Sequence, residues 1–301
     1  MTDPRGYLIC NTCGVQYADT DPSKRTSCPV CDDPRQWVPV SGQSWTTLRQ
    51  LQESGRYRNE FTPLDNDRLA TKDCKLISIH TQPNFAISQR ALLCVSPKGN
   101  ILWDCITYID DETIRRIKDE YGGVSAIVIS HPHYYSTCLH WAEALQCPVY
   151  IAAEDEQWLM RRGESIRFWN ESRLSFCDGE FVCIKAGGHF PGSSVMYWPR
   201  TSKLLVADTM HVVPSGVYHE NRPQGTTSFT FMWSYPNMIP LPPDEIFNIW
   251  KAIKELDFED AHGGFPGRDA YGRSRARVLE SAKIIISAMG YKDHAVHAEV
   301  A

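Results

Sequence analysis

The stretch "VISHPHYYSTCLHW", residues 128–141, places His131 and His133 at the end of an apolar run. The preceding letters "VSAIVIS" are typical of a short buried strand, and the following "STCLHWAEAL" predicts a helix. Imidazole is a common metal ligand, and two histidines separated by one residue often begin a metal site. We therefore interpret this strand-to-helix junction as the first part of such a site.

Three further strand-like segments lead directly to residues that can bind a metal. "CIKAGG" precedes His189, "KLLVA" precedes Asp208, and "LDFEDA" precedes His262. Strand ends that face a common crevice are where α/β proteins usually bind ligands. The sequence therefore predicts that these side chains join the first two histidines in one metal site.

The bulk composition limits the classes of function. The chain has 301 residues, 42% of them hydrophobic, and a formal net charge of −5, which argues against a general nucleic-acid surface. Its start, "MTDPRGYLIC", lacks the basic and apolar regions of a secretory signal, and no segment approaches the ~20 apolar residues of a membrane span. We expect a cytoplasmic protein with no nucleic-acid or membrane partner.

Four of the eleven cysteines form two closely spaced pairs near the N-terminus. "CNTCG" contains Cys10 and Cys13, and "CPVC" contains Cys28 and Cys31. Each pair can direct two thiolates at one point, and two pairs complete a tetrahedral metal site. The segment from about residue 5 to 40 resembles zinc ribbons and rubredoxin-like modules. Zinc is the metal we expect, although four thiolates also accept iron.

The order of predicted elements indicates the domain organisation. We expect a zinc-ribbon or rubredoxin-like module at residues 1–40, a connector at 41–70 and a larger domain at 71–301. In the larger domain, strand-like runs are followed by helical ones rather than alternating strictly with them. This pattern predicts an α+β fold with two packed sheets and helices outside.

From about residue 75 to 290 the chain resembles the metallo-β-lactamase superfamily. The features follow one another in that family's order: "ILWDCI" with Asp104, the histidine motif, "GGHFPGSSV", "VADTM" and "AHGG". The resemblance implies an αββα sandwich and a metal-dependent hydrolase. It also implies that Asp104 holds loops beneath the site by hydrogen bonds rather than binding the metal.

The resemblance assigns roles to the candidate ligands. His131, His133 and His189 match the ligands of the first metal, and Asp208 matches the carboxylate that commonly bridges two metals. His262 falls near a remaining ligand of the second metal, with a second-layer or structural role as the alternative.

The main motif departs from the family pattern at two positions. The usual form is His-x-His-x-Asp-His, whereas this chain has Tyr135 and Ser136 where the aspartate and third histidine stand. Both replaced residues are ligands of the second metal. The departure therefore favours a single-metal site.

Three histidines can hold one zinc and leave a fourth position for water. A metal lowers the pKa of such a water to about 7, which makes hydroxide available at neutral pH. We expect Asp208 to replace the missing acid and Tyr135 to hydrogen-bond the oxyanion or leaving group. For Tyr135, a packing role without chemistry is the alternative.

An aromatic segment provides the candidate substrate wall. "TTSFTFMWSYPNMIPLPP" contains Phe231, Trp233 and Tyr235, which would suit a small apolar or aromatic substrate. The alternative is that these side chains belong to the core.

These features support three functions. The first is hydrolysis of an ester, lactone, thioester or amide bond of a small molecule. The second is a mononuclear iron oxygenase or redox enzyme that uses His131, His189 and Asp208. The third is a non-catalytic protein with a degenerate pocket. A homo-oligomer is compatible with each of them.

Overall fold

The computed structural model describes residues 3–64, 73–217, 223 and 225–301. The chain forms two compact units, Met1–Asn170 and Glu171–Ala301. The predicted N-terminal module and most of the predicted connector belong to the first unit, and residues 65–70 of the connector lie outside the described residues. The predicted domain boundaries stay a prediction, and each unit is described here by itself.

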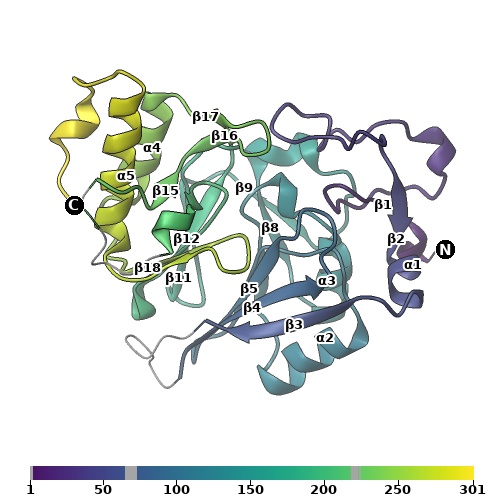
Figure 1. Cartoon of the computed structure of the whole chain (residues 1–301). Helices are drawn as coiled ribbons and strands as arrows, with labels where there is room; N and C mark the ends of the chain where they lie inside the picture. Colours follow the sequence, from purple (N-terminus) through teal and green to yellow (C-terminus); the bar gives the residue numbers. More distant parts are fainter. Residues whose placement is uncertain (1–2, 65–72, 218–222, 224) are drawn as a thin grey trace. The chain divides into compact units, whose positions relative to one another are not determined.

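A mixed sheet of seven strands forms the centre of the first unit (Figure 1). The first four strands pair antiparallel and the last four pair parallel, so that β6 has one partner of each kind. Residues of the inner strands are almost all buried, as expected for a sheet covered on both faces. In spatial order the strands are β3 (Arg58–Pro63), β4 (Lys75–Gln82), β5 (Arg90–Val95), β6 (Ile101–Trp103), β7 (Ala126–Val128), β8 (Val149–Ala152) and β9 (Ile166–Trp169).

Short helices connect these strands. After residue 110 the chain forms α2 and a following π-helical turn, η3, and Asp110 caps α2 by accepting the Thr113 N–H at 2.8 Å. Element η3 contacts β3 through Arg116, whose Cζ lies 4.1 Å from the centroid of the Phe61 ring. The helical elements of this unit outside the N-terminal segment are α1 (Leu48–Glu53), α2 (Asp111–Arg115), η3 (Arg116–Glu120), η4 (Pro132–Tyr134), α3 (Cys138–Leu145) and η5 (Ala153–Trp158).

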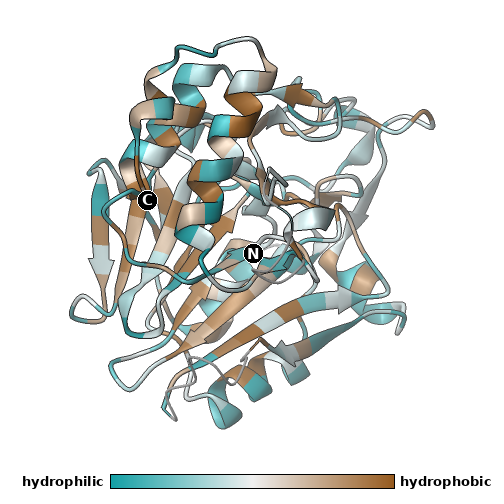
Figure 2. Ribbon diagram, turned by 60° about the vertical axis from the view of Figure 1, so that its left-hand side comes forward, coloured by the Kyte–Doolittle hydropathy of each residue, from teal (hydrophilic) through white to brown (hydrophobic). Residues whose placement is uncertain are grey.

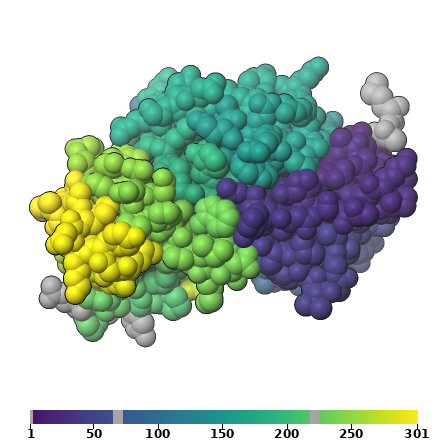
Figure 3. All heavy atoms as spheres, turned by 90° about the horizontal axis from the view of Figure 1, so that it is seen from above, coloured from purple at the N-terminus to yellow at the C-terminus, as the bar shows by residue number. Residues whose placement is uncertain are grey.

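The N-terminal segment packs against the rest of the first unit. Strand β1 (Leu8–Cys10) pairs antiparallel with β2 (Trp45–Thr47), and two 3-10 turns, η1 (Pro4–Gly6) and η2 (Pro22–Lys24), complete the segment. In Figure 3 these purple residues lie directly against teal residues of the same unit, and the Gln16 N–H donates to the Ser136 carbonyl at 3.1 Å.

The second unit contains a six-stranded sheet and two small hairpins. Strands β10 to β13 form an antiparallel meander, and β18 then pairs parallel with β13. In spatial order the sheet strands are β10 (Arg173–Phe176), β11 (Phe181–Lys185), β12 (Ser194–Trp198), β13 (Lys203–Ala207), β18 (Asp260–Gly263) and β19 (Asp269–Ala270). The hairpins are β14 (His211–Val212) with β15 (Phe229–Thr230), and β16 (Met232–Ser234) with β17 (Ile239–Pro240).

Two longer helices, α4 (Pro243–Ile253) and α5 (Ser274–Ala288), pack on this second sheet. Ile246, Ile249, Trp250 and Ile253 recur at helical spacing on α4 and are all buried in the core of the unit. Figure 2 shows the same alternation, with teal and brown residues on the helices and mostly brown ones in the sheet strands. The remaining turns are η6 (Pro199–Thr201), η7 (Pro214–Gly216) and η8 (Ala295–Ala298).

The predicted α+β class is confirmed, because each unit combines a sheet of mostly antiparallel or mixed strands with helices outside it. None of the helices in the described parts of the chain combines the length and the apolar character that a bilayer crossing requires.

A buried ion pair joins β13 to β18 and gives a test of this sheet. Lys203 Nζ lies 2.9 Å from Asp260 Oδ2, and the two side chains are 5% and 3% exposed. We expect Lys203→Met to lower the free energy of unfolding by about 3–5 kcal/mol, because it leaves a buried carboxylate without its cation. Urea unfolding followed by tryptophan fluorescence measures this loss.

The double variant Lys203→Met/Asp260→Asn is the matched control. Its amide oxygen can still accept the Gly272 N–H, which Asp260 Oδ1 accepts at 3.0 Å in the native chain. It should therefore recover part of the lost stability; an equal loss in both variants would show that the charge pairing is not what matters.

Candidate metal centres

The four N-terminal cysteines come together in the first unit, as the spacing predicts. Their sulfur atoms all lie within 4.8 Å of one another, with 3.5 Å between Cys10 and Cys31 and 3.7 Å between Cys13 and Cys28. A tetrahedral site with metal–sulfur bonds of ~2.3 Å has sulfur–sulfur edges of about 3.8 Å. The four thiols therefore already have the spacing of a zinc or iron site.

Tight turns direct these thiols inward. The Gly14 N–H donates to the Cys10 carbonyl at 2.9 Å, and Gly14 has a φ of +81°, which a side chain would disfavour. In the second turn the Cys28 N–H donates to the Asp32 carboxylate at 3.0 Å. Burial raises the pKa of the Cys13 thiol well above its usual range, so four thiolates require a cation among them.

The first histidines lie where the parallel strand β7 ends. Ser130 donates its backbone N–H to the carboxylate of Asp104 at 2.7 Å, which confirms the predicted loop-holding role of Asp104. Ser130 Oγ lies 2.9 Å from His131 Nδ1 and so fixes the orientation of that ring. The ligand atoms of His131 and His133 lie within 4.8 Å of each other, and both side chains are buried.

The two tyrosines of the motif have different surroundings. The Tyr135 hydroxyl donates to the Asp155 carbonyl at 3.1 Å, and burial raises its pKa well above the usual range. The Tyr134 ring lies against His131, with the ring centroids 5.0 Å apart. This arrangement favours the packing alternative for Tyr135, and its catalytic role stays a prediction.

The second unit presents His189 and Asp208 on neighbouring loops. Each follows a strand of the same sheet, and their ligand atoms lie within 4.8 Å of each other. His189 Nδ1 lies 3.0 Å from the Trp233 carbonyl, which can only accept, so this nitrogen is the donor. Nε2 then carries the lone pair that a metal requires.

Tyr235 supports both of these residues. Its hydroxyl donates to the backbone carbonyl of Asp208 at 2.9 Å, and its ring centroid lies 5.5 Å from that of His189. Burial raises the pKa of this phenol well above the usual range, so it remains a donor at neutral pH.

His262 lies within strand β18 rather than after a strand as the sequence suggested. Its Nδ1 donates to Asp269 Oδ1 at 2.8 Å, and both residues are buried register partners on β18 and β19. No group of potential metal ligands among the described residues includes His262. The geometry therefore favours the structural alternative for this histidine.

The predicted aromatic wall divides between core and loop. Phe231 is 1% exposed and packs in the hydrophobic core of the second unit, so its side chain supports the fold. Trp233 and Tyr235 are only partly buried and adjoin His189 through the contacts described above. A wall role stays a prediction for these two residues.

Several residues of the site have no signal in the sequence. The Trp233 contact to His189 uses a backbone carbonyl, and Ser130 and Tyr134 act through contacts that turn geometry creates. The position of Ser130 directly before His131 is the one sequence feature that indicates its contact with that histidine.

Comparison with known proteins agrees with this architecture. No family model matches the chain. The uncharacterized protein YmaE of Bacillus subtilis (strain 168) is 40% identical over 264 residues, which cover 86% of this chain and 88% of YmaE.

Solved structures show the fold. The DIM-1 metallo-β-lactamase is similar with a TM-score of 0.53 at 13% identity, over 76% of this chain and 98% of that one. The metallo-β-lactamase FIM-1 from Pseudomonas aeruginosa, in its mono-zinc form, has a TM-score of 0.50 at 16% identity, over 76% and 96% of the two chains. The chain thus has the metallo-β-lactamase fold, and its identity to YmaE makes it a member of the YmaE family.

Proposed function

We propose that the chain is a metal-dependent hydrolase whose metal is held by His131, His133, His189 and Asp208. The observation that carries the proposal is that each unit brings two buried ligand side chains together, His131 with His133 and His189 with Asp208, in a chain with the metallo-β-lactamase fold. Three imidazoles and a carboxylate fit zinc, and they also accept iron.

A metal at this position supplies water activated near neutral pH and polarises the bond to be cleaved. The chain's own residues orient the ligands. Ser130 fixes the His131 ring, the Trp233 carbonyl fixes the tautomer of His189, and Tyr235 holds the backbone of Asp208. The Asp208 carboxylate is then positioned to bind the metal or to accept the proton of the attacking water.

The residues that replace the second-metal ligands support a single-metal site. Tyr135 donates to a backbone carbonyl, and Ser136 Oγ lies 3.4 Å from both the Cys105 carbonyl and Gln89 Nε2. Their polar groups therefore form hydrogen bonds in the interior of the first unit. The existence of a mono-zinc form of FIM-1 supports the view that this fold accepts one zinc.

The substrate we propose is a small molecule with an apolar or aromatic part and an ester, lactone, thioester or amide bond. Trp233 and Tyr235, which adjoin His189, are the side chains we assign to its recognition. No charged group contributes to this assignment.

Metal content tests the proposal directly. We expect two metal ions per native chain and one in His131→Ala, because the four-cysteine site does not depend on that histidine. Elemental analysis of the purified protein, with zinc and iron counted separately, measures this.

The matched control is His294→Ala, which removes a histidine whose Nε2 lies 3.2 Å from the exposed carboxylate of Asp244. It should leave both metals in place. Equal metal content in the native chain and His131→Ala would refute the proposed centre, whereas iron in place of zinc at this centre would favour the oxygenase alternative.

Turnover separates the roles of two residues. Asp208→Asn should lower kcat by about 10²–10⁴-fold, because it removes a carboxylate that binds metal or accepts a proton. Tyr135→Phe should leave kcat within about twofold and lower the free energy of unfolding by about 1 kcal/mol, the contribution of one hydrogen bond.

Hydrolysis of a panel of aryl esters, lactones and thioesters measures both effects, with thermal unfolding as the accompanying readout. A large loss of kcat in Tyr135→Phe at unchanged stability would restore the catalytic role of this tyrosine.

A further inference from the structure

We infer that the four-cysteine module is a positioning element for the histidine motif, so that a metal bound by the cysteines strengthens metal binding by His131 and His133. This inference rests on the proposed function for the second metal, and it concerns residues of the first unit alone. It follows from how the module, a connecting segment and the motif contact one another.

A short segment after β6, residues 104–107, contacts both partners. At its start the Asp104 carboxylate accepts the Ser130 N–H, immediately before His131. At its end the Thr107 carbonyl accepts the Thr137 hydroxyl at 2.8 Å, and the Thr107 hydroxyl donates to the Gly14 carbonyl at 3.1 Å. Gly14 directly follows Cys13. Thr107 therefore links the cysteine turn to Thr137, four residues after His133.

The module also contacts the motif directly. The Gln16 N–H donates to the Ser136 carbonyl at 3.1 Å, three residues after His133. Ser136 is one of the residues that replace second-metal ligands. At position 136 the chain therefore has a residue that binds the N-terminal module in place of a metal ligand.

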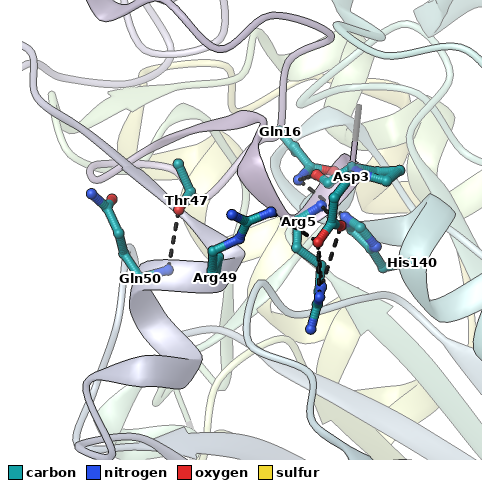
Figure 4. Close-up of polar contacts among 8 residues, drawn as sticks. Asp3, Arg5, Gln16, Thr47, Arg49, Gln50 and His140 are labelled. Carbon is teal, nitrogen blue, oxygen red and sulfur yellow. Dashed lines mark hydrogen bonds and ion pairs between the residues drawn. The ribbon is translucent and has the colours of Figure 1, made fainter. Parts of the chain in front are cut away.

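The Gln16 side chain extends this contact to helix α3 (Figure 4). Its Nε2 lies 3.2 Å from the Pro4 carbonyl and 3.1 Å from His140 Nε2, and Arg161 donates to its Oε1. Burial, and then the nearby Arg161 charge, lower the pKa of His140 to about 4. His140 is therefore a neutral acceptor for the Gln16 amide at neutral pH.

The contact between module and motif is tight. A Cβ atom on Gly14 would lie 2.0 Å from Thr107 Oγ1, so no side chain fits there. The cavity lined by Val15, Gln16 and residues 135–139 has a volume of only ≈ 10 Å³, at or below the space that one water needs. A close contact of this kind transmits a displacement of one partner to the other.

The shape of the module depends on its metal. A segment of this size buries too little apolar surface to hold four converging thiols by itself, and metal binding supplies the missing stability. Without the metal, the turns at Gly14 and Gln16 lose their fixed position. Ser136 then loses the hydrogen bond from Gln16, and Thr107, which binds Thr137, loses its hydrogen bond to Gly14.

The experiment measures Co²⁺ binding to the histidine centre by its visible absorption, in the full chain with the cysteine site filled by Zn²⁺. In Cys28→Ser/Cys31→Ser we expect Co²⁺ to bind the histidine centre at least 10-fold more weakly, the size of effect that outer contacts have on metal affinity. Cys177→Ser, outside the module, is the control and should retain native affinity.

A second pair of variants avoids the loss of the module's own metal. Thr107→Val removes the hydroxyl that donates to Gly14 and should weaken Co²⁺ binding about 3- to 10-fold and alter its absorption bands. Thr107→Ser restores the hydroxyl and should restore both readouts. Elemental analysis confirms that the cysteine site remains filled in this pair.

The outcomes separate the two proposals. If the native chain binds no second metal, the proposed function fails and this inference fails with it. If the native chain binds Co²⁺ and the Thr107→Val variant binds it with the same affinity and spectrum, this inference alone is overturned, whether or not the cysteine variant folds.

Discussion

The hydrogen bond from the Ser130 N–H to the Asp104 carboxylate is the constraint on which the histidine centre depends. Strands β6 and β7 pair in parallel, with Trp103 opposite Val128, so Asp104 and Ser130 emerge side by side where the two strands end. At 2.7 Å and with Asp104 1% exposed, this is a buried charge-assisted bond. It fixes the backbone immediately before His131, and so it sets the starting position of the turn that contains both histidines.

The sequence predicts the parts of the fold that local patterns control. Apolar runs that end in His131 and Asp208 predict strands followed by ligands, and the spacing of Cys10, Cys13, Cys28 and Cys31 predicts their convergence. These features depend on residues close together in the chain. They can therefore be predicted without knowledge of the tertiary structure.

Contacts set by register and turn geometry could not be predicted in the same way. Tyr134 and Tyr135 are adjacent and chemically identical, and the 3-10 turn η4 decides that Tyr134 faces His131 while Tyr135 faces Asp155. His262 is likewise paired with Asp269 because a hairpin brings β18 and β19 into register. No property of the single residues reveals either outcome.

Three of the non-glycine residues with a positive φ lie close to the candidate ligands in the sequence or in contact with their loops. Asp104 has a φ of +66°, Ser136 of +43° and Ala207, which precedes Asp208, of +44°. Residues other than glycine pay about 1–3 kcal/mol for such conformations, which persist only where the surrounding contacts over-determine them. Asp104 and Ser136 are held by the hydrogen bonds that join β7, the segment after β6 and the N-terminal module. These hydrogen bonds offset the cost of the strained backbone at both residues, and they hold the chain on either side of His131 and His133.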